Sequence, residues 1–334
     1  MWLQAFRPAF TAALALASIA AVQTQSPDWD SSGDIKVFPV QGQVSMLVGA
    51  GGNIAVQAGP EGVLVVDSGV SAHAEKMLAA VRTVSSAPIR WLVNTSFLPD
   101  HTGGNALLAK NGATTNANPL PIVAHENVLA RMSAASGGAT VAPTAAWPTD
   151  AYVKRGKDFF FNGEPILVYH PENGVTDGDS IVHFRRSDVL VAGETWVTTR
   201  YPIIDRAHGG GVQGVIDGLN YLLDVAVPAH QQEGGTFVIP GHGRVGDEAD
   251  VLEYRDMVTI VRDRIKDMVQ RGQTLAQVKA ARPTLDYDRQ YGAERGPWTT
   301  GQFIEAIYDD VSAGLKPSPA SRPAPGPTPA RGSK

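Results

Sequence analysis

The strongest constraint on the fold is a stretch in which an apolar strand leads directly to a carboxylate, an imidazole and a pair of glycines. Residues 89–93 have the apolar character of a buried strand, and residues 105–108 have the pattern of a helix start. Asp100 and His101 lie side by side on the connection between them. Loops at strand ends often carry the chemistry of a fold, and glycines let the following helix start close to the sheet. The stretch therefore predicts a metal site at the end of a strand.

The segment around residues 94–105 resembles the metallo-β-lactamase superfamily, whose signature is His-x-His-x-Asp-His followed by Thr-Gly-Gly-Asn. Asp100 and His101 match this signature, whereas Ser96 and Leu98 stand where the family has its two leading histidines. Further similarity extends over about residues 34–312, so the resemblance does not depend on one motif. It implies an α+β fold, the four-layer αββα sandwich in which two mixed sheets face each other between outer helices.

The resemblance also assigns roles to four positions outside this segment. In the family a histidine precedes Thr-Asp-Gly-Asp, a metal-bridging aspartate follows a strand that ends in glycine, and a histidine lies within Pro-Gly-His-Gly. Here those positions hold Val175, Glu194 and His242. Asp67, at the end of another apolar strand, matches an aspartate that supports the metal loop, and a turn-capping role is the alternative.

All the lost ligands fall in one of the family's two metal sites, and Glu194 keeps the charge of the bridging aspartate. The three-histidine site corresponds to Ser96, Leu98 and Val175, and we expect the leucine and the valine to fill the vacated space by packing. The second site keeps its ligands, which are Asp100, His101 and His242, with Glu194 beside them. We expect this set to hold at most one divalent ion, with zinc preferred over manganese or iron, or no ion at all.

Three functions are compatible with such a site. The first is a metal-dependent hydrolase, in which the ion lowers the pKa of bound water toward ~7 and an ester, lactone, amide or thioester is cleaved. Asp100 and Glu194 are its candidate catalytic residues, with Glu194 as a fourth ligand or a general base. The second is an inactive pseudoenzyme that binds a small molecule or a protein, and the third is an iron protein that handles electrons or oxygen. We favour the hydrolase.

Periodicity predicts the remaining secondary structure. Strands are expected within residues 34–67 and 121–124, a hairpin over residues 158–169 and a long loop over residues 133–150. Helices are expected over residues 72–84, 125–132, 212–225, 248–270 and 302–315. His125 is expected to start its helix rather than to bind metal, and His170 is not assumed to replace the histidine missing at Val175.

The two ends of the chain differ in composition from the rest. An apolar run at residues 12–22 follows Arg7 and is shorter than the roughly 20 residues of a membrane span, which predicts a cleaved signal peptide over residues 1–25. An uncleaved anchor is the alternative. Residues 26–315 are expected to form a single domain, and the Pro-rich residues 316–334 a disordered tail. The expected location is the periplasm or the exterior, without stable membrane insertion.

Composition excludes several functions. The chain has 28 basic and 33 acidic residues without a basic run, so it lacks the electrostatic footprint of a nucleic-acid-binding protein. It has no cysteine, which excludes disulfides, thiolate ligands and cysteine nucleophiles. The expected partner is therefore a small-molecule substrate or ligand.

Overall fold

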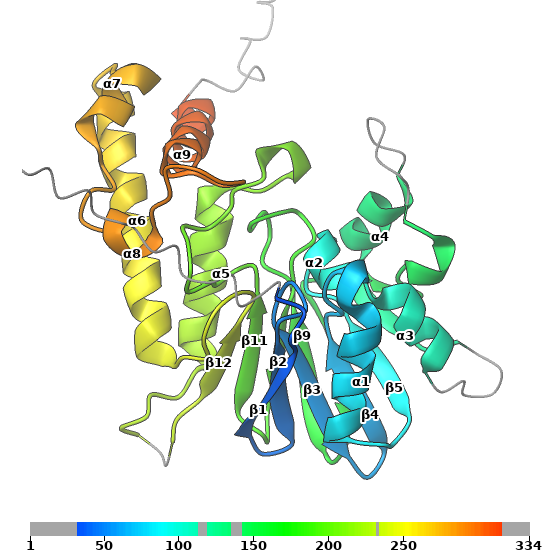
Figure 1. Ribbon diagram of the computed structural model, residues 1–334. Helices are drawn as coiled ribbons and strands as arrows, with labels where there is room; N and C mark the ends of the chain where they lie inside the picture. Colours follow the sequence, from blue (N-terminus) through cyan, green and yellow to red (C-terminus); the bar gives the residue numbers. More distant parts are fainter. Residues whose placement is uncertain (1–31, 113–118, 135–141, 232–233, 316–334) are drawn as a thin grey trace, which may run out of the picture.

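The computed structural model describes four stretches of the chain, residues 32–112, 119–134, 142–231 and 234–315 (Figure 1). The expected signal peptide and C-terminal tail lie outside the described residues, as does part of the loop expected over residues 133–150. In the described stretches, every helix is too short or too polar to cross a bilayer.

The first sheet has seven strands in sequence order. They are β1 (Lys36–Gln41), β2 (Val44–Val48), β3 (Ile54–Gly59), β4 (Gly62–Val66), β5 (Ile89–Val93), β6 (Ile122–His125) and β7 (Asp150–Tyr152). Strands β1 to β4 are antiparallel to their neighbours, whereas β4 to β7 run parallel. The C-terminal ends of these parallel strands therefore meet at one edge of the sheet, which is where their connecting loops can share a site.

The second sheet has five strands in the order β12-β11-β10-β9-β8. They are β8 (Gly156–Phe161), β9 (Glu164–Tyr169), β10 (Ile181–Phe184), β11 (Val189–Gly193) and β12 (Phe237–Pro240). The predicted hairpin is β8 and β9, whose turn residues Asn162 and Gly163 have φ angles of 52° and 78°, as a primed turn requires. Only β11 and β12 are parallel, so their C-terminal ends also meet.

Clusters of buried apolar side chains hold the sheets and helices together. Within β4, Leu64 and Val66 belong to the cluster between the two sheets, whereas Val63 and Val65 belong to the cluster beneath the helices of the first sheet. Because both faces of β4 are covered, its sequence is an unbroken apolar run rather than an alternating one.

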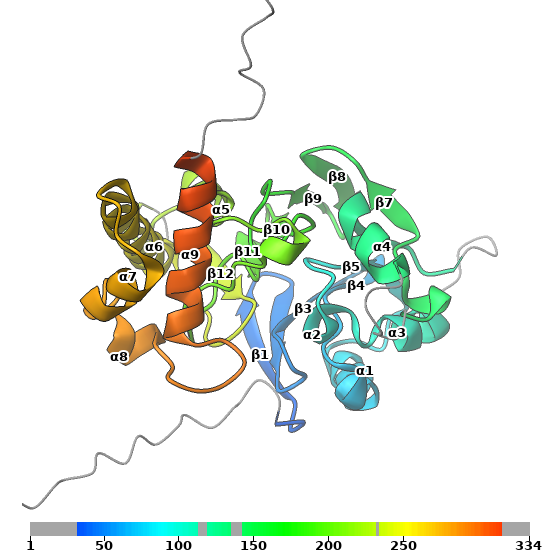
Figure 2. The same ribbon diagram turned by 90° about the horizontal axis from the view of Figure 1, so that it is seen from above.

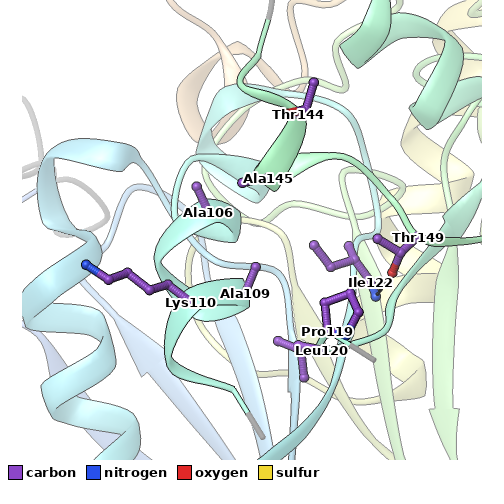
Figure 3. Close-up of a pocket in the computed structure, with 9 residues that line it drawn as sticks. All are labelled: Ala106, Ala109, Lys110, Pro119, Leu120, Ile122, Thr144, Ala145 and Thr149. Carbon is purple, nitrogen blue, oxygen red and sulfur yellow. Dashed lines mark hydrogen bonds between the residues drawn. The ribbon is translucent and has the colours of Figure 1, made fainter. Parts of the chain in front are cut away.

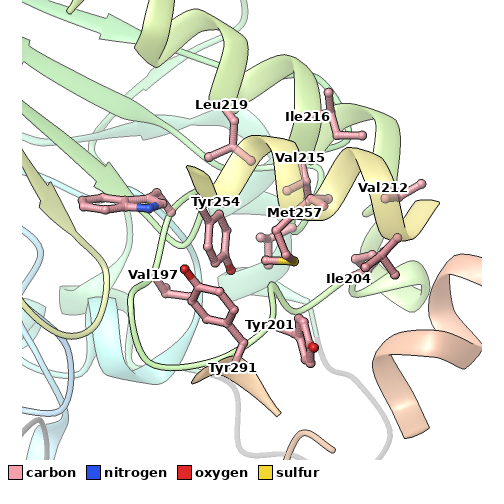
Figure 4. Packing of buried hydrophobic residues seen from close by; sticks show 14 of the residues in the cluster. Val197, Tyr201, Ile204, Val212, Val215, Ile216, Leu219, Tyr254, Met257 and Tyr291 are labelled. Atoms are coloured by element: carbon pink, nitrogen blue, oxygen red, sulfur yellow. The ribbon is translucent and has the colours of Figure 1, made fainter. Parts of the chain in front are cut away.

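Helices cover the outer face of each sheet, which confirms the predicted α+β four-layer sandwich (Figures 1 and 2). Those near the first sheet are η1 (Ser71–His73), α1 (Ala74–Val84), α2 (Pro99–Thr102), α3 (Asn105–Asn111), α4 (Glu126–Ser133) and η2 (Thr144–Ala146). The others are η3 (Arg206–His208), α5 (Val212–Val225), α6 (Glu248–Gln270), α7 (Leu275–Ala281), α8 (Asp288–Tyr291) and α9 (Thr300–Leu315). Figure 4 shows part of the apolar cluster between the second sheet and its helices, where Leu219 of α5 lies near Tyr254 and Met257 of α6.

The paired glycines hold the start of α3 against the first sheet. A Cβ atom on Gly103 would lie 2.3 Å from the backbone nitrogen of Ser71, and one on Gly104 would lie 2.4 Å from the carbonyl oxygen of Ser68. The close approach expected from the sequence is therefore present. The sequence placed Asp100 and His101 on a loop, whereas they form part of α2, a single turn that begins at a proline.

Candidate metal centre

Four side chains that could hold a metal ion converge where three strands end. Asp100 and His101 lie on α2, which follows β5, while Glu194 directly follows β11 and His242 lies two residues beyond β12. Each offers one ligand atom, and these atoms all lie within 4.8 Å of one another. Helix α2 lies at the upper end of the sheets in Figure 1. The two parallel arrangements of strands thus bring together residues that are up to 142 positions apart.

His101 is fully buried and held at both ring nitrogens. Its Nδ1 lies 2.8 Å from Oδ2 of Asp67, and its Nε2 lies 3.3 Å from Oε1 of Glu194. Asp67 also accepts hydrogen bonds from the backbone nitrogen and the hydroxyl of Thr95, at 2.7 and 2.5 Å. Because Nδ1 is taken up by Asp67, Nε2 is the ring nitrogen of His101 that faces the other three side chains. Asp67 thus lies where a residue that supports the metal loop is expected.

Glu194 connects the two histidines to the guanidinium of Arg200. Its Oε1 lies 2.9 Å from Nε2 of His242, and its Oε2 accepts a hydrogen bond from Arg200 at 2.7 Å. The same His242 nitrogen lies 3.1 Å from Oδ2 of Asp100. The side chain of Glu194 is 1% exposed and that of Asp100 is 28% exposed, so Asp100 is the carboxylate that water can reach.

The charges of the cluster shift its pKa values. Burial raises the pKa of Glu194, but Arg200 and His242 lower it more, so it lies well below its ordinary value. Burial lowers the pKa of His101, but Asp67 and Asp100 raise it well above 6.5. Burial likewise raises the pKa of Asp100, and the neighbouring His101 and the hydrogen bond with His242 reverse that effect, so it is lowered. The cluster therefore keeps its carboxylates ionised.

These residues fit one divalent ion. Two imidazole nitrogens and two carboxylates form a donor set that zinc, manganese and iron all accept. With neutral histidines, three carboxylates including that of Asp67 and one guanidinium give the cluster a net charge of −2. A divalent ion balances this charge, as do protons on the histidines, so ion binding is coupled to proton release.

The positions of the missing histidines lie in a different environment. Ser96 and Val175 are fully buried, and Val175 belongs to the apolar cluster between the second sheet and its helices. This is the dry surrounding that the packing prediction requires for Val175. Leu98 is half-buried, and its expected contact with Val175 stays a prediction.

The two other conspicuous histidines have hydrogen-bonding roles. His125 accepts a hydrogen bond from the backbone nitrogen of Asn127 at the start of α4, which confirms the predicted helix-start role. The Nδ1 of His170 lies 2.7 Å from the carbonyl oxygen of Asp179, and its ring stacks on that of His125 with centroids 3.8 Å apart. Among the described residues, neither belongs to a group of three or more potential ligands. His170 thus does not rebuild the lost site.

Arg200 and Thr95 are two site residues that the sequence analysis missed. Thr95 was hidden because it acts through hydrogen bonds with Asp67 and His101 and is not one of the four donors. Arg200 carried a signal, since it is the only basic residue between positions 187 and 205, on the loop that follows Glu194. A lone cation beside a buried strand-end carboxylate is a candidate ion-pair partner.

Two cavities lie in the described part of the protein. One of about 400 Å³ is lined mainly by small and apolar side chains of α3 and the loops around it, and includes none of the four donors (Figure 3). A second, of about 270 Å³, is lined by residues that follow Glu194 and His242 in sequence, among them Trp196, Thr198 and Gly243. The second cavity therefore adjoins the loops that carry two donors.

Comparison with known sequences decides the family. The sequence model of the metallo-beta-lactamase superfamily matches residues 48–256, which is more than half of the chain and includes all four donors. This protein belongs to the metallo-beta-lactamase superfamily. A search of curated protein sequences found no match.

Several solved structures share its fold. The metallo-beta-lactamase from Pontibacter korlensis is 17% identical over 67% of this chain and 99% of its own, with a TM-score of 0.53. The DIM-1 metallo-beta-lactamase is 14% identical over 67% of this chain and 97% of its own, with a TM-score of 0.50. The sec-alkylsulfatase Pisa1 from Pseudomonas sp. is 15% identical over 85% of this chain, with a TM-score of 0.58. The match covers 52% of the sulfatase, so this chain spans about half its length.

Proposed function

We propose that this protein is a hydrolase that uses one divalent metal ion, for which zinc is the first choice. The residues that would hold the ion are Asp100, His101, Glu194 and His242. The observation that carries the proposal is the convergence of their four ligand atoms within 4.8 Å, with His101 already oriented by Asp67. Superfamily membership supports the same reaction type. The predicted signal peptide supports action in the periplasm or outside the cell.

The chain's own residues divide the work of hydrolysis between them. The bound ion would supply an acidified water and polarise the substrate carbonyl. Asp100 is the more exposed carboxylate and can accept a proton from entering water, whereas both oxygens of Glu194 are engaged by His242 and Arg200. Because its oxygens are buried and already paired, Glu194 is the poorer proton acceptor of the two. We therefore assign Asp100 as the general base and Glu194 as a ligand.

The proposed substrate is a small ester, lactone, amide or thioester. The cavity of about 270 Å³ beside Trp196 and Gly243 supports a small molecule, because a pocket of that size cannot hold a folded partner. A sulfate ester is a reasonable addition to any substrate panel, since one structure with a similar fold is a sec-alkylsulfatase.

The test is hydrolysis of such a panel by the zinc-loaded protein, by chelator-treated protein and by Asp100→Asn. We expect at least one substrate class to be cleaved, the activity to vanish with the metal and return on its addition, and Asp100→Asn to lose at least about 100-fold in kcat. Activity that survives complete removal of metal, or that Asp100→Asn retains in full, would contradict the assignment.

A second function has one observation in its favour. The donor groups also hydrogen-bond one another, with His101 and His242 both against Glu194, so the cluster is satisfied without an ion. Such a hydrogen-bonded cluster is sufficient for a pseudoenzyme that binds a small molecule or a protein. Protein that binds no zinc, manganese or iron when these are supplied would favour the pseudoenzyme, and an iron content that changes redox state would favour the iron protein.

A further inference from the structure

We propose that Arg200 takes the electrostatic place of the missing second metal ion and thereby limits the centre to one ion. The inference rests on the proposed function, because it concerns how this chain holds a single divalent ion. It assigns a role to a residue that lies outside the superfamily ligand positions described above.

The two oxygens of Glu194 face different positive groups. Oε1 lies against the surviving site, at 2.9 Å from His242 and 3.3 Å from His101. Oε2 is bound by the guanidinium of Arg200 at 2.7 Å. In the superfamily pattern the carboxylate at this position bridges two ions, whereas here one oxygen faces the two histidines and the other binds a guanidinium. A fixed cation at that oxygen opposes the approach of a second cation.

Arg200 is held in the fold rather than lying loosely on the surface. Its side chain is 22% exposed, and its backbone carbonyl accepts a hydrogen bond from the buried hydroxyl of Tyr254 on α6 at 3.1 Å. The next residue, Tyr201, is buried and stacks on Phe303 of α9 with ring centroids 4.5 Å apart. The helical layer on the second sheet thus fixes the loop that carries the guanidinium.

The charge of the cluster matches one ion only because Arg200 is present. Asp67, Asp100 and Glu194 carry three negative charges, and the guanidinium reduces the net charge to −2. Without Arg200 the donors would be more negative and would attract a divalent ion more strongly. With it, one divalent ion neutralises the site, and a second would leave an excess of positive charge in a buried place.

A purely structural role for Arg200 predicts the opposite result. If Arg200 only positions Glu194, its removal misplaces a ligand and weakens ion binding. If it substitutes for a cation, its removal strengthens ion binding, because the ion itself then holds Glu194. The direction of the change in zinc affinity therefore separates the two roles.

The experiment is competition for zinc against a coloured chelator at pH 8, with Arg200→Gln, Arg200→Lys and the parent protein. We expect Arg200→Gln to bind the first zinc at least about tenfold more tightly, since a nearby positive charge is removed. Arg200→Lys keeps the charge and should bind within about threefold of the parent. Arg131→Gln, which breaks an ion pair with Asp177 that includes none of the four donors, is the matched control and should also equal the parent.

Weaker zinc binding by Arg200→Gln, or equal changes in the glutamine and lysine variants, would overturn the inference while leaving the single-ion hydrolase intact. A parent that binds no divalent ion would defeat the proposed function instead, so the two failures are distinct. Circular dichroism checks that each variant folds. If Arg200→Gln does not fold, Arg200→Met keeps a side chain of similar length and makes the same comparison.

Discussion

At the scale of single residues, the orientation of His101 depends on a carboxylate in an uncommon backbone conformation. Asp67 has a φ of 65°, in the left-handed region where aspartate and asparagine are among the few tolerated side chains. This conformation turns its carboxylate toward both His101 and Thr95. The strain is thus localised at the residue that orients His101, a proposed metal ligand.

Asp67→Asn tests this role without disturbing the backbone. The amide keeps the shape and tolerates the positive φ, but it is a weaker acceptor for the Nδ1 proton of His101, so we expect zinc affinity to fall about 10- to 100-fold. Asp188→Asn is the matched control, because Asp188 has a φ of 54° and binds Thr236 outside the cluster. Equal zinc affinity in the Asp67→Asn variant and the parent would remove Asp67 from the site.

The charges of the cluster also predict how the metal-free protein responds to pH. A raised pKa means that protonated His101 stabilises the fold fully below pH 6.5, and that this stabilisation is lost as pH rises through the folded pKa. The lowered pKa of Glu194 acts in the opposite direction and is felt only below about pH 4.5. In chelator, denaturant unfolding should show a free energy of unfolding that falls above pH 6.5.

Bound zinc should remove most of the decrease in the free energy of unfolding above pH 6.5, because the ion requires neutral histidines. His101→Gln provides the comparison, and its stability in chelator should depend less on pH above 6.5 than that of the parent. A parent whose stability in chelator is flat from pH 6.5 to pH 9 would show that His101 is not held as the structure describes.

At the scale of elements, the start of α3 depends on two glycines, Gly103 and Gly104. An alanine at position 103 would bring its Cβ within 2.3 Å of the backbone of Ser71, and backbone cannot move aside cheaply. Gly103→Ala should lower the free energy of unfolding by about 1–3 kcal/mol. Gly314→Ala, a helical position with nothing within 4 Å of the added methyl, should be neutral or slightly stabilising. Equal denaturation midpoints for the two variants would contradict the close packing of α3.

The sequence predicted elements best where the apolar pattern was long or the turn chemistry strong. The strand Ile89–Val93 and the helices Val212–Val225 and Glu248–Gln270 have the bounds expected, and the turn at Asn162 is the expected one. The three-residue strand β7 was not predicted, because it is too short to show a period and exists only through pairing with β6. Helix α8, a single turn, was missed for the same reason.

At the scale of the whole molecule, the sequence identified the donor residues but not how they contact one another. Asp100, Glu194 and His242 could be matched to a superfamily pattern, and the parallel strands then brought them together. The ion pair between Arg200 and Glu194 was not predictable in this way, because it depends on the path of a loop held by α6. The single-domain boundaries and the cellular location of the protein stay predictions.

The central claim is that each chain has one working metal site, and metal content measures it most directly. Zinc per chain should be determined after dialysis for the parent, His101→Ala, His242→Ala and Ser96→Ala. We expect one zinc in the parent and in Ser96→Ala, and less than about 0.1 in either histidine variant, since each loses one of only two imidazole ligands. Two zinc ions in the parent, or a full zinc in His242→Ala, would contradict the account.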